Sequence, residues 1–243
     1  MLNIYVTTCD SYDRLLKPFS YLFNKFWDDS IKVTILGYRT PPFELPKNFN
    51  FISIGERQIS VNHWSTDLYN FFNTIDDEFF IFAVEDLFIC DYVDTDILNK
   101  LIDNIDKETG RIALVNTFQN NCSYEITNKY DNFSIGTASQ GSDCRFSVIW
   151  SIFNREWFLK YVKPNETGTP WVTEAEGDND SKFDTYDVKG PISRSAIKCT
   201  SAVRKNINST LGFKIMDEDE SLDERIIEDM INKKLISKDR TII

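Results

Sequence analysis

Two adjacent acids, Glu85 and Asp86, end a run of apolar residues that begins at Phe79. A short apolar run of aromatic and β-branched residues is typical of a strand that is buried on both faces. Open α/β sheets bind ligands just beyond the carboxyl ends of their strands. Carboxylates there can hold a divalent cation and, through it, a diphosphate. The pattern favours a nucleotide-sugar enzyme, and the alternative is that both acids simply begin a solvated loop.

A second acidic pair, Glu174 and Glu176, follows Pro170 and Trp171 at the expected start of a helix. The helix dipole favours carboxylates in the first turn, so Glu174 could simply complement that dipole. As a general base, Glu174 would need partial burial, for example beside Trp171, to keep its pKa near the working pH. The sequence leaves both interpretations open.

Polar residues also follow two other expected strands. Thr7, Thr8 and Asp10 end the first strand, where they could contact a base or a ribose. Arg57 follows the third strand, where it could pair with Asp10. The alternatives are that Asp10 caps the next helix and that Arg57 is solvated.

The segment 188–216 contains no acid, although the chain has a formal net charge of −11. Such a segment should attract an anion, and its glycine, serine and threonine residues suit a flexible loop that closes over a phosphate. The alternative is a basic surface that is solvated or pairs with acids elsewhere. The basic residues of the segment are Lys189, Arg194, Lys198, Arg204, Lys205 and Lys214.

Several common catalytic motifs are missing from the sequence. His63 is the only histidine and no Gly-x-Ser-x-Gly motif occurs, which disfavours a Ser-His-Asp hydrolase and a histidine-based zinc site. The chain has no Gly-x-x-x-x-Gly-Lys-Ser/Thr loop and no Gly-x-Gly-x-x-Gly after the first strand. The absence of these motifs disfavours P-loop enzymes and dinucleotide-dependent dehydrogenases.

The composition excludes further classes of protein. The 243 residues are 42% apolar, which is ordinary for a globular protein. The net charge of −11 argues against a general nucleic-acid binder and against adhesion to anionic membranes. No stretch approaches the roughly 20 apolar residues of a membrane span, and the first residues do not read as a signal peptide. We therefore expect a cytoplasmic protein whose five cysteines are reduced.

Alternating strand and helix patterns over the first 115 residues predict a mostly parallel sheet flanked by helices. The polar middle of the chain predicts short antiparallel strands, such as 132–136. Further strands are predicted at 3–7, 31–36, 51–54, 77–86, 111–115 and 146–153. Helices are predicted at 14–26, 62–73 and 94–105, after Asn154, from Trp171, and at 222–233.

Three segments together resemble the GT-A-type glycosyltransferases, which are nucleotide-sugar-dependent enzymes with a Rossmann-like α/β fold. The segments are NIYVTTCDSY from Asn3, HWSTDLYNFFNTIDDEFFIFAVEDLFI from His63 and WSIFNREWFLKYVKPNETGTPWVTEAEG from Trp150. The third is similar to the acceptor-side half of small bacterial and viral sugar transferases. The resemblance implies a single domain over 1–243. Its parts are a nucleotide-sugar-binding half at 1–115, an acceptor half with a basic loop at 116–216 and a C-terminal helix at 217–243.

The resemblance implies transfer of a sugar from a nucleoside diphosphate sugar to a hydroxyl of a glycan, lipid or protein acceptor, with inversion. The metal-binding Asp-x-Asp motif of such enzymes maps to Glu85 and Asp86, which implies Mg²⁺ or Mn²⁺, but Leu87 and Phe88 stand where a second Asp is usual. The catalytic base maps to Glu174 first and Glu176 second. The residues expected to contact the donor are Thr7, Thr8, Asp10, Arg57, Lys198 and Arg204.

Two alternatives to a glycosyltransferase stay open. A nucleotidyltransferase would share the fold and the acidic strand end, but its usual glycine-rich, lysine-containing loop is missing after the first strand. A non-catalytic carbohydrate-binding protein with a decayed transferase fold would explain the imperfect acidic motif. For each possibility we expect no nucleic-acid partner and no membrane span.

Overall fold

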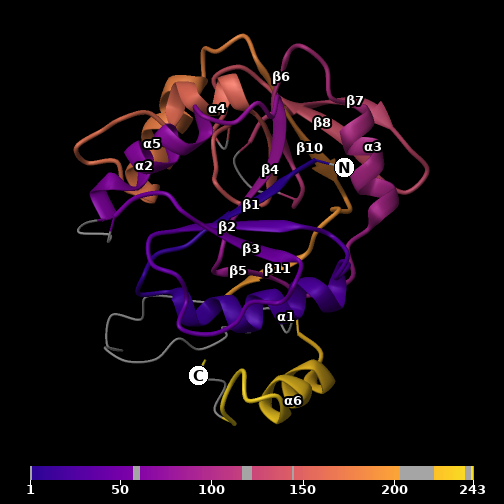
Figure 1. The fold of residues 1–243 in the computed structure, drawn as a ribbon. Coiled ribbons are helices and arrows are strands. Elements are labelled where there is room, and N and C mark those ends of the chain that lie inside the picture. Colours follow the sequence, from indigo (N-terminus) through magenta and orange to yellow (C-terminus); the bar gives the residue numbers. More distant parts are fainter. Residues whose placement is uncertain are drawn as a thin grey trace.

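The structure, a computed structural model, describes residues 2–56, 61–116, 122–143, 145–202, 222–238 and 242. Nine strands form one large sheet in the order β3-β2-β1-β4-β9-β6-β10-β8-β7, and helices lie on both sides of it (Figure 1). The strands are β1 (Ile4–Thr7), β2 (Val33–Gly37), β3 (Phe49–Ser53), β4 (Phe79–Val84), β6 (Thr109–Ala113), β7 (Tyr124–Lys129), β8 (Ser134–Ala138), β9 (Ser151–Asn154) and β10 (Asp187–Ile192).

A second, two-stranded sheet pairs β5 with β11 in antiparallel fashion. Its strands are β5 (Leu87–Ile89) and β11 (Cys199–Ser201). The helices are α1 (Leu16–Phe26), α2 (Trp64–Phe72), α3 (Thr95–Asp103), α4 (Arg155–Tyr161), α5 (Pro170–Ser181) and α6 (Glu224–Asn232).

All described strands of the large sheet except β9 and β8 run in one direction. β1 pairs in parallel with β2 and β4, β2 with β3, and β6 with β10. β9 lies antiparallel between β4 and β6, and β8 lies antiparallel between β10 and β7. The prediction of a mostly parallel α/β sheet with a smaller antiparallel part is confirmed. As a consequence, β1, β2, β3 and β4 all end at the same edge.

The sheet is buried because its strands supply alternate residues to two separate cores. Ile4 and Val6 of β1 pack in the core that contains the inner side of α1. Tyr5, between them, packs in the other core with the inner sides of α2 and α4. α1 buries apolar residues at spacings of three and four, as an amphipathic helix does. They are Leu16, Phe19, Leu22, Phe23 and Phe26.

One strand prediction is wrong over most of its length. The sequence predicted a strand at 146–153, but β9 begins only at Ser151. Three backbone N–H groups of the segment 145–148 donate to the side chains of Asp178 and Glu174 on α5. These groups are therefore bonded to a helix and are not available to a neighbouring strand.

The prediction of a flexible basic loop is wrong for the beginning of the segment 188–216. β10, which begins at Asp187, lies inside the large sheet. Lys189 in this strand is 6% exposed, and its ammonium donates to Asp106 Oδ2 at 2.6 Å. The Lys189 ammonium therefore forms an ion pair that is part of the fold.

Across the ranges that the structure describes, no helix has both the length and the apolar surface needed to cross a membrane.

The close approach of α5 to the segment before β9 depends on Gly177. A Cβ at this position would lie 2.8 Å from Cδ1 of Phe146 and 3.2 Å from Cβ of Tyr161. Because both neighbours are buried, we expect Gly177→Ala to lower the free energy of unfolding by about 1–3 kcal/mol, although alanine is the better helix former. Urea denaturation measures the change. Asn179→Ala on the exposed side of α5 is the control, with an expected change within about 0.5 kcal/mol. A Gly177→Ala protein as stable as the wild type would contradict this packing.

Candidate active site

The ends of β1 and β4 bring Thr8 and Glu85 together. In the parallel pair, Thr7 lies opposite Val84, so the residues that follow the two strands are neighbours. Thr8 Oγ1 donates to Glu85 Oε1 at 3.1 Å, and the backbone N–H of Cys9 donates to the same oxygen, with an N–O distance of 3.4 Å. The first of the two predicted acids therefore joins the ends of two strands.

Glu85 is a buried carboxyl group, 5% exposed. Burial, reinforced by the negative charge of Asp86, raises the pKa of Glu85 to about 8. Glu85 therefore retains its proton at neutral pH. Its hydrogen bonds with Thr8 and Cys9 fix the turn after β4.

Asp86 is less buried than Glu85 and lies closer to the other acidic residue of the site. Its backbone carbonyl accepts a hydrogen bond from Ala202 N at 2.7 Å, which ties the turn to the end of β11. Burial raises the pKa of the Asp86 carboxyl, and the negative charge of Glu174 raises it further. The structure thus brings Asp86 and Glu174 near one another from distant parts of the chain.

α5 fixes the position of Glu174. Thr169 caps the helix by accepting a hydrogen bond from Val172 N at 3.1 Å, and Pro170 occupies the first turn, as capping preferences favour. Glu174 Oε1 accepts hydrogen bonds from Ser147 Oγ and from Val148 N, both at 2.8 Å. Glu174 therefore also anchors the segment before β9.

Glu176 lies on a different side of α5. Residues two apart in a helix point about 200° away from each other, and Glu176 Oε2 accepts a hydrogen bond from Asn165 Nδ2 at 3.2 Å. Of the two acids predicted on this helix, Glu174 is the one whose charge raises the pKa of Asp86.

Thr7 and Asp10 lie at the end of β1, next to Thr8. Thr7 is 2% exposed, and its hydroxyl has no hydrogen-bond partner among the described residues. Asp10 Oδ1 accepts a hydrogen bond from Arg39 N at 3.1 Å, and Asp10 Oδ2 lies 3.9 Å from Arg39 Nε. The sequence analysis missed Arg39, although it follows β2, the strand beside β1. Arg57, the predicted partner of Asp10, lies outside the described residues.

The basic residues predicted to contact the donor do not gather at the acids in the described part of the chain. Lys198 Nζ lies 2.7 Å from Asp91 Oδ2, and Arg194 pairs with Asp94 at the same distance. Lys198 and Arg194 are thus each paired with a partly exposed acid. Arg204 lies outside the described residues.

Two residues that the sequence analysis did not select also lie near the acids. Burial raises the pKa of Tyr12, and the charges of Cys9, Asp86 and Glu85 raise it further. Burial also raises the pKa of Cys199 to about 12, with contributions from Cys90 and Asp86. Cys199 reaches the site only through the pairing of β11 with β5, and a three-residue strand gives no periodic signal in the sequence.

The described acids could hold a cation only with further ligands. The structure contains no group of three or more His, Cys, Asp or Glu able to hold a metal within its described ranges. In the same ranges no lysine or arginine forms an ion pair with Glu85, Asp86 or Glu174. Carboxylate oxygens are the ligands that Mg²⁺ and Mn²⁺ prefer. A cation at Asp86 would therefore have to take further ligands from phosphates and water.

No protein-family model matches this sequence, and no curated protein matches it significantly. Among solved structures, the apo form of the glycosyltransferase GlyE from Streptococcus pneumoniae TIGR4 is similar to this chain at 13% identity and a TM-score of 0.45. The match covers 77% of this chain and 45% of GlyE. This chain thus spans less than half the length of GlyE.

Two further solved structures are similar to this chain. The mannosyltransferase PcManGT from Pyrobaculum calidifontis, in complex with GDP-Man and Mn²⁺, matches at 13% identity and a TM-score of 0.48, over 84% of this chain and 57% of that one. A197 from STIV matches at 12% identity and a TM-score of 0.39, over 84% and 87%. GlyE and PcManGT are glycosyltransferases, the class that the sequence resembles. Because all three TM-scores are below 0.5, we draw no conclusion about function or residue roles from them.

The buried Glu85 carboxyl should make stability depend on pH. In the folded protein the Glu85 carboxyl keeps its proton up to about pH 8. In the unfolded chain it releases the proton near its ordinary pKa of 4.5. The contribution of Glu85 to the free energy of unfolding should therefore fall as the pH rises from about 4.5 to about 8, by about 1.4 kcal/mol per unit.

Glu85→Gln isolates this effect because glutamine keeps an acceptor for Thr8 and Cys9 but cannot ionise. In EDTA-containing buffer, its stability relative to wild type should increase by up to a few kcal/mol between about pH 5 and 9. Urea denaturation at both pH values is the measurement, and Glu176→Gln is the exposed control. An equal difference at the two pH values would show that Glu85 ionises normally.

Proposed function

We propose that this protein is a glycosyltransferase that moves a sugar from a nucleoside diphosphate sugar to a hydroxyl of a glycan, lipid or protein acceptor, with inversion. Residues 1–115 would bind the donor and residues 116–216 the acceptor, with the C-terminal helix at 217–243 outside both. We place this activity in the cytoplasm, where the thiols of Cys9, Cys90, Cys122 and Cys199 stay reduced.

The observation that carries this proposal is that Glu85 and Asp86 follow β4 where it ends beside β1, with Glu174 near enough for its charge to raise the pKa of Asp86. Burial and the charge of Glu174 both disfavour ionisation of Asp86, and no described lysine or arginine pairs with either residue. Two carboxylates in this arrangement favour a site that is completed by a positive charge. A divalent cation that arrives with a diphosphate supplies that charge.

In this proposal the Asp86 carboxylate would bind the divalent cation that accompanies the donor diphosphate. When bound, Mg²⁺ or Mn²⁺ would offset the charge that develops on the leaving diphosphate. Glu85, the other acid proposed for the metal, supports Asp86 by fixing the turn through Thr8 and Cys9. Arg57 and Arg204 would add positive charge near the diphosphate, whereas Lys198 would first have to leave its ion pair with Asp91.

Glu174 is the proposed general base. Its Oε1 is held by Ser147 and Val148, so the carboxylate has a fixed orientation toward an acceptor hydroxyl. A positioned base of this kind accelerates proton transfer by roughly 10²–10⁴-fold. Trp171, one turn earlier on α5 and 57% exposed, offers a ring on which an acceptor sugar could stack.

The nucleotide would lie at the end of β1. Thr7, Thr8 and Asp10 follow one another there, and the buried hydroxyl of Thr7 has no partner among the described residues. Asp10, oriented by Arg39, would accept a hydrogen bond from the base or the ribose.

Turnover of nucleoside diphosphate sugars tests the proposal. UDP-, GDP- and dTDP-sugars would be incubated with the protein and Mn²⁺, and nucleotide release measured with and without EDTA. We expect release of at least one nucleotide and its loss in EDTA. Glu174→Gln should lower kcat by about 100-fold or more, while Glu176→Gln, an identical change on the same helix, should retain most of the activity.

The opposite ranking of the two variants would assign the base to Glu176. Equal activity of both variants with the wild type would remove α5 from the chemistry. Sugar binding without affinity for any nucleotide would overturn the proposal in favour of a binding protein.

A further inference from the structure

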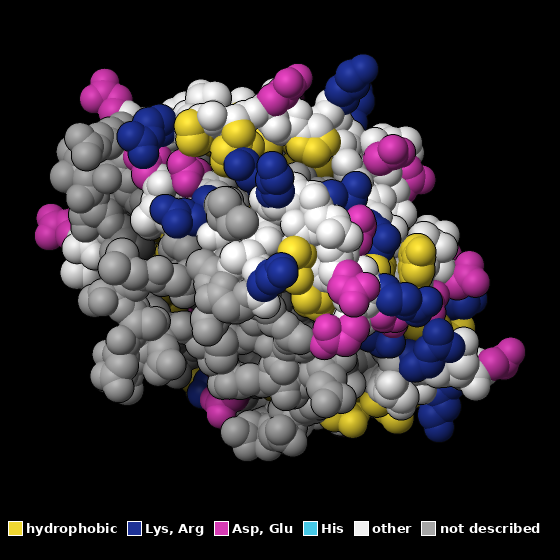
Figure 2. Space-filling model, turned by 90° about the horizontal axis from the view of Figure 1, so that it is seen from below, with side chains coloured by type: hydrophobic (Ala, Val, Ile, Leu, Met, Phe, Trp, Pro, Cys, Tyr) yellow, Lys and Arg dark blue, Asp and Glu magenta, His cyan; other side chains and the backbone are white. Residues whose placement is uncertain are grey.

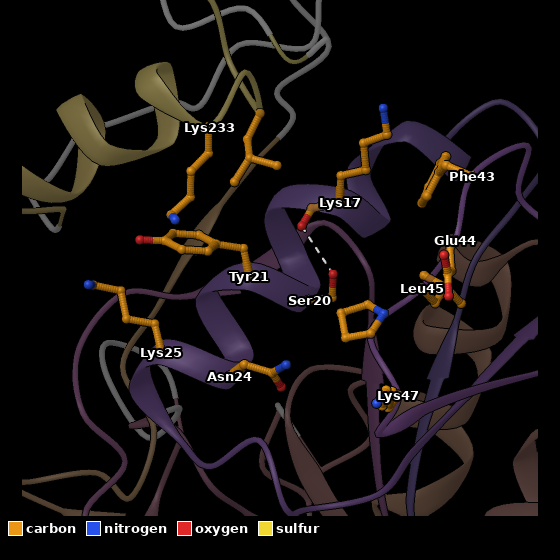
Figure 3. A pocket seen from close by; sticks show the side chains of 12 residues that line it. Lys17, Ser20, Tyr21, Asn24, Lys25, Phe43, Glu44, Leu45, Lys47 and Lys233 are labelled. Atoms are coloured by element: carbon orange, nitrogen blue, oxygen red, sulfur yellow. Dashed lines mark hydrogen bonds between the residues drawn. The ribbon is translucent and has the colours of Figure 1, made fainter.

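A groove lies on the outer side of α1, the helix whose inner side packs against the sheet. Its volume is about 640 Å³, within the range of small-molecule sites. α1, the loop 43–47 and the segment after α6 form its walls (Figure 3). None of the acids of the candidate active site lines it. The groove is therefore separate from the candidate active site.

One end of the groove is positively charged. Lys25 Nζ on α1 and Lys233 Nζ after α6 lie 5.9 Å and 5.8 Å from the centre of the Tyr21 ring. In Figure 3 these two lysines approach Tyr21 from separate elements. Asp229, which accepts a hydrogen bond from Tyr21 Oη, lies 3.9 Å from Lys233 Nζ. Two ammonium groups against one carboxylate leave a net positive charge at Tyr21.

The other wall of the groove is mostly apolar. Phe43, Leu45 and Pro46 form it (Figure 3). Lys17 Nζ lies over the Phe43 ring, 5.0 Å from its centre, so the hydrocarbon stem of Lys17 adds to the apolar surface. Lys47 stands at the rim, and Glu44 is the one acid among the lining residues.

The charge of the groove is opposite to that of the whole chain. Its lining has four lysines and one acid, whereas the chain has a formal net charge of −11. Figure 2 shows the molecule from below, the side on which α1 and α6 lie, where basic side chains stand beside apolar and acidic ones. An anion is attracted to such a local positive region, and an apolar group is favoured by the adjoining wall.

We propose that this groove binds a single molecule of an anionic amphiphile, with a phosphate head between Lys25 and Lys233 and an apolar chain along Phe43, Leu45 and Pro46. The separation of a charged end from an apolar wall matches a ligand with one anionic head. An extended acidic peptide would instead require cations along the whole groove. An intact anionic bilayer is disfavoured because it would repel the rest of this acidic protein.

Calorimetric titration of the full-length protein with decyl phosphate, below its critical micelle concentration, tests this inference. Two compounds serve as controls. Inorganic phosphate has the anionic head without the apolar chain, and decyl maltoside is an amphiphile without charge. We expect saturable binding of decyl phosphate at one site and binding at least about tenfold weaker for both controls. The Lys25→Gln/Lys233→Gln double variant should bind decyl phosphate about tenfold more weakly, a loss of about 1.4 kcal/mol.

The matched control is Lys107→Gln/Lys129→Gln, which removes the same charge from positions that do not line the groove. It should bind as the wild type does. Leu45→Asn should weaken decyl phosphate binding and leave inorganic phosphate binding unchanged. Thermal melts of each variant confirm that it is folded.

Three results would overturn the inference. If both double variants bound decyl phosphate equally weakly, the loss would come from the net charge of the protein and not from the groove. Inorganic phosphate binding as tightly as decyl phosphate would leave only an anion site. Binding to anionic phospholipid vesicles without binding to monomeric decyl phosphate would assign the groove to a membrane surface.

Discussion

The hydrogen bond from Thr8 to the buried Glu85 carboxyl is the contact on which the candidate site depends. It joins the ends of β1 and β4 at the edge where four parallel strands end. A carboxyl group buried to this extent is costly in its charged form, and burial accordingly raises the pKa of Glu85. With Glu85 fixed in the turn, Asp86 is the acid that remains for a ligand.

The opposite side of the site depends on α5. Glu174 and Asp178, one turn apart, accept hydrogen bonds from backbone N–H groups of the segment 145–148. The same contacts that stop this segment from continuing β9 also fix the Glu174 carboxylate, whose charge raises the pKa of Asp86. A structural interpretation of Glu174 and a catalytic one are therefore compatible, because one of its oxygens suffices to anchor the segment.

Much of the fold could be predicted from periodicity. The apolar run before Glu85 forms β4, the spacing of the phenylalanines predicts α1, and Asn154 caps α4 by accepting from Trp157 N as expected. The prediction failed where tertiary contacts override local pattern. The apolar segment before Ser151 reads as a strand, yet its N–H groups bond to side chains of α5 that are distant in the sequence.

The site residues that come directly after strands could be predicted from the sequence. The ion pairs between distant residues could not. Glu85, Asp86 and Thr8 could be selected because parallel strands end together. The ion pairs of Lys198 with Asp91 and of Arg194 with Asp94 could not, since charge counts do not reveal partners. Lys189 reads as a loop residue by composition, but β10 and Asp106 make it part of the sheet interior.

The most direct test of the central claim is whether Asp86 binds a divalent cation together with a nucleoside diphosphate. Electron paramagnetic resonance can follow free Mn²⁺ during titration of the wild type, Asp86→Asn and the exposed control Asp103→Asn, each with and without UDP or GDP. We expect one Mn²⁺ to bind to the wild type and to Asp103→Asn in the presence of a nucleotide, and this binding to be lost in Asp86→Asn. Undiminished Mn²⁺ binding by Asp86→Asn, or no nucleotide-dependent binding by the wild type, would contradict the account.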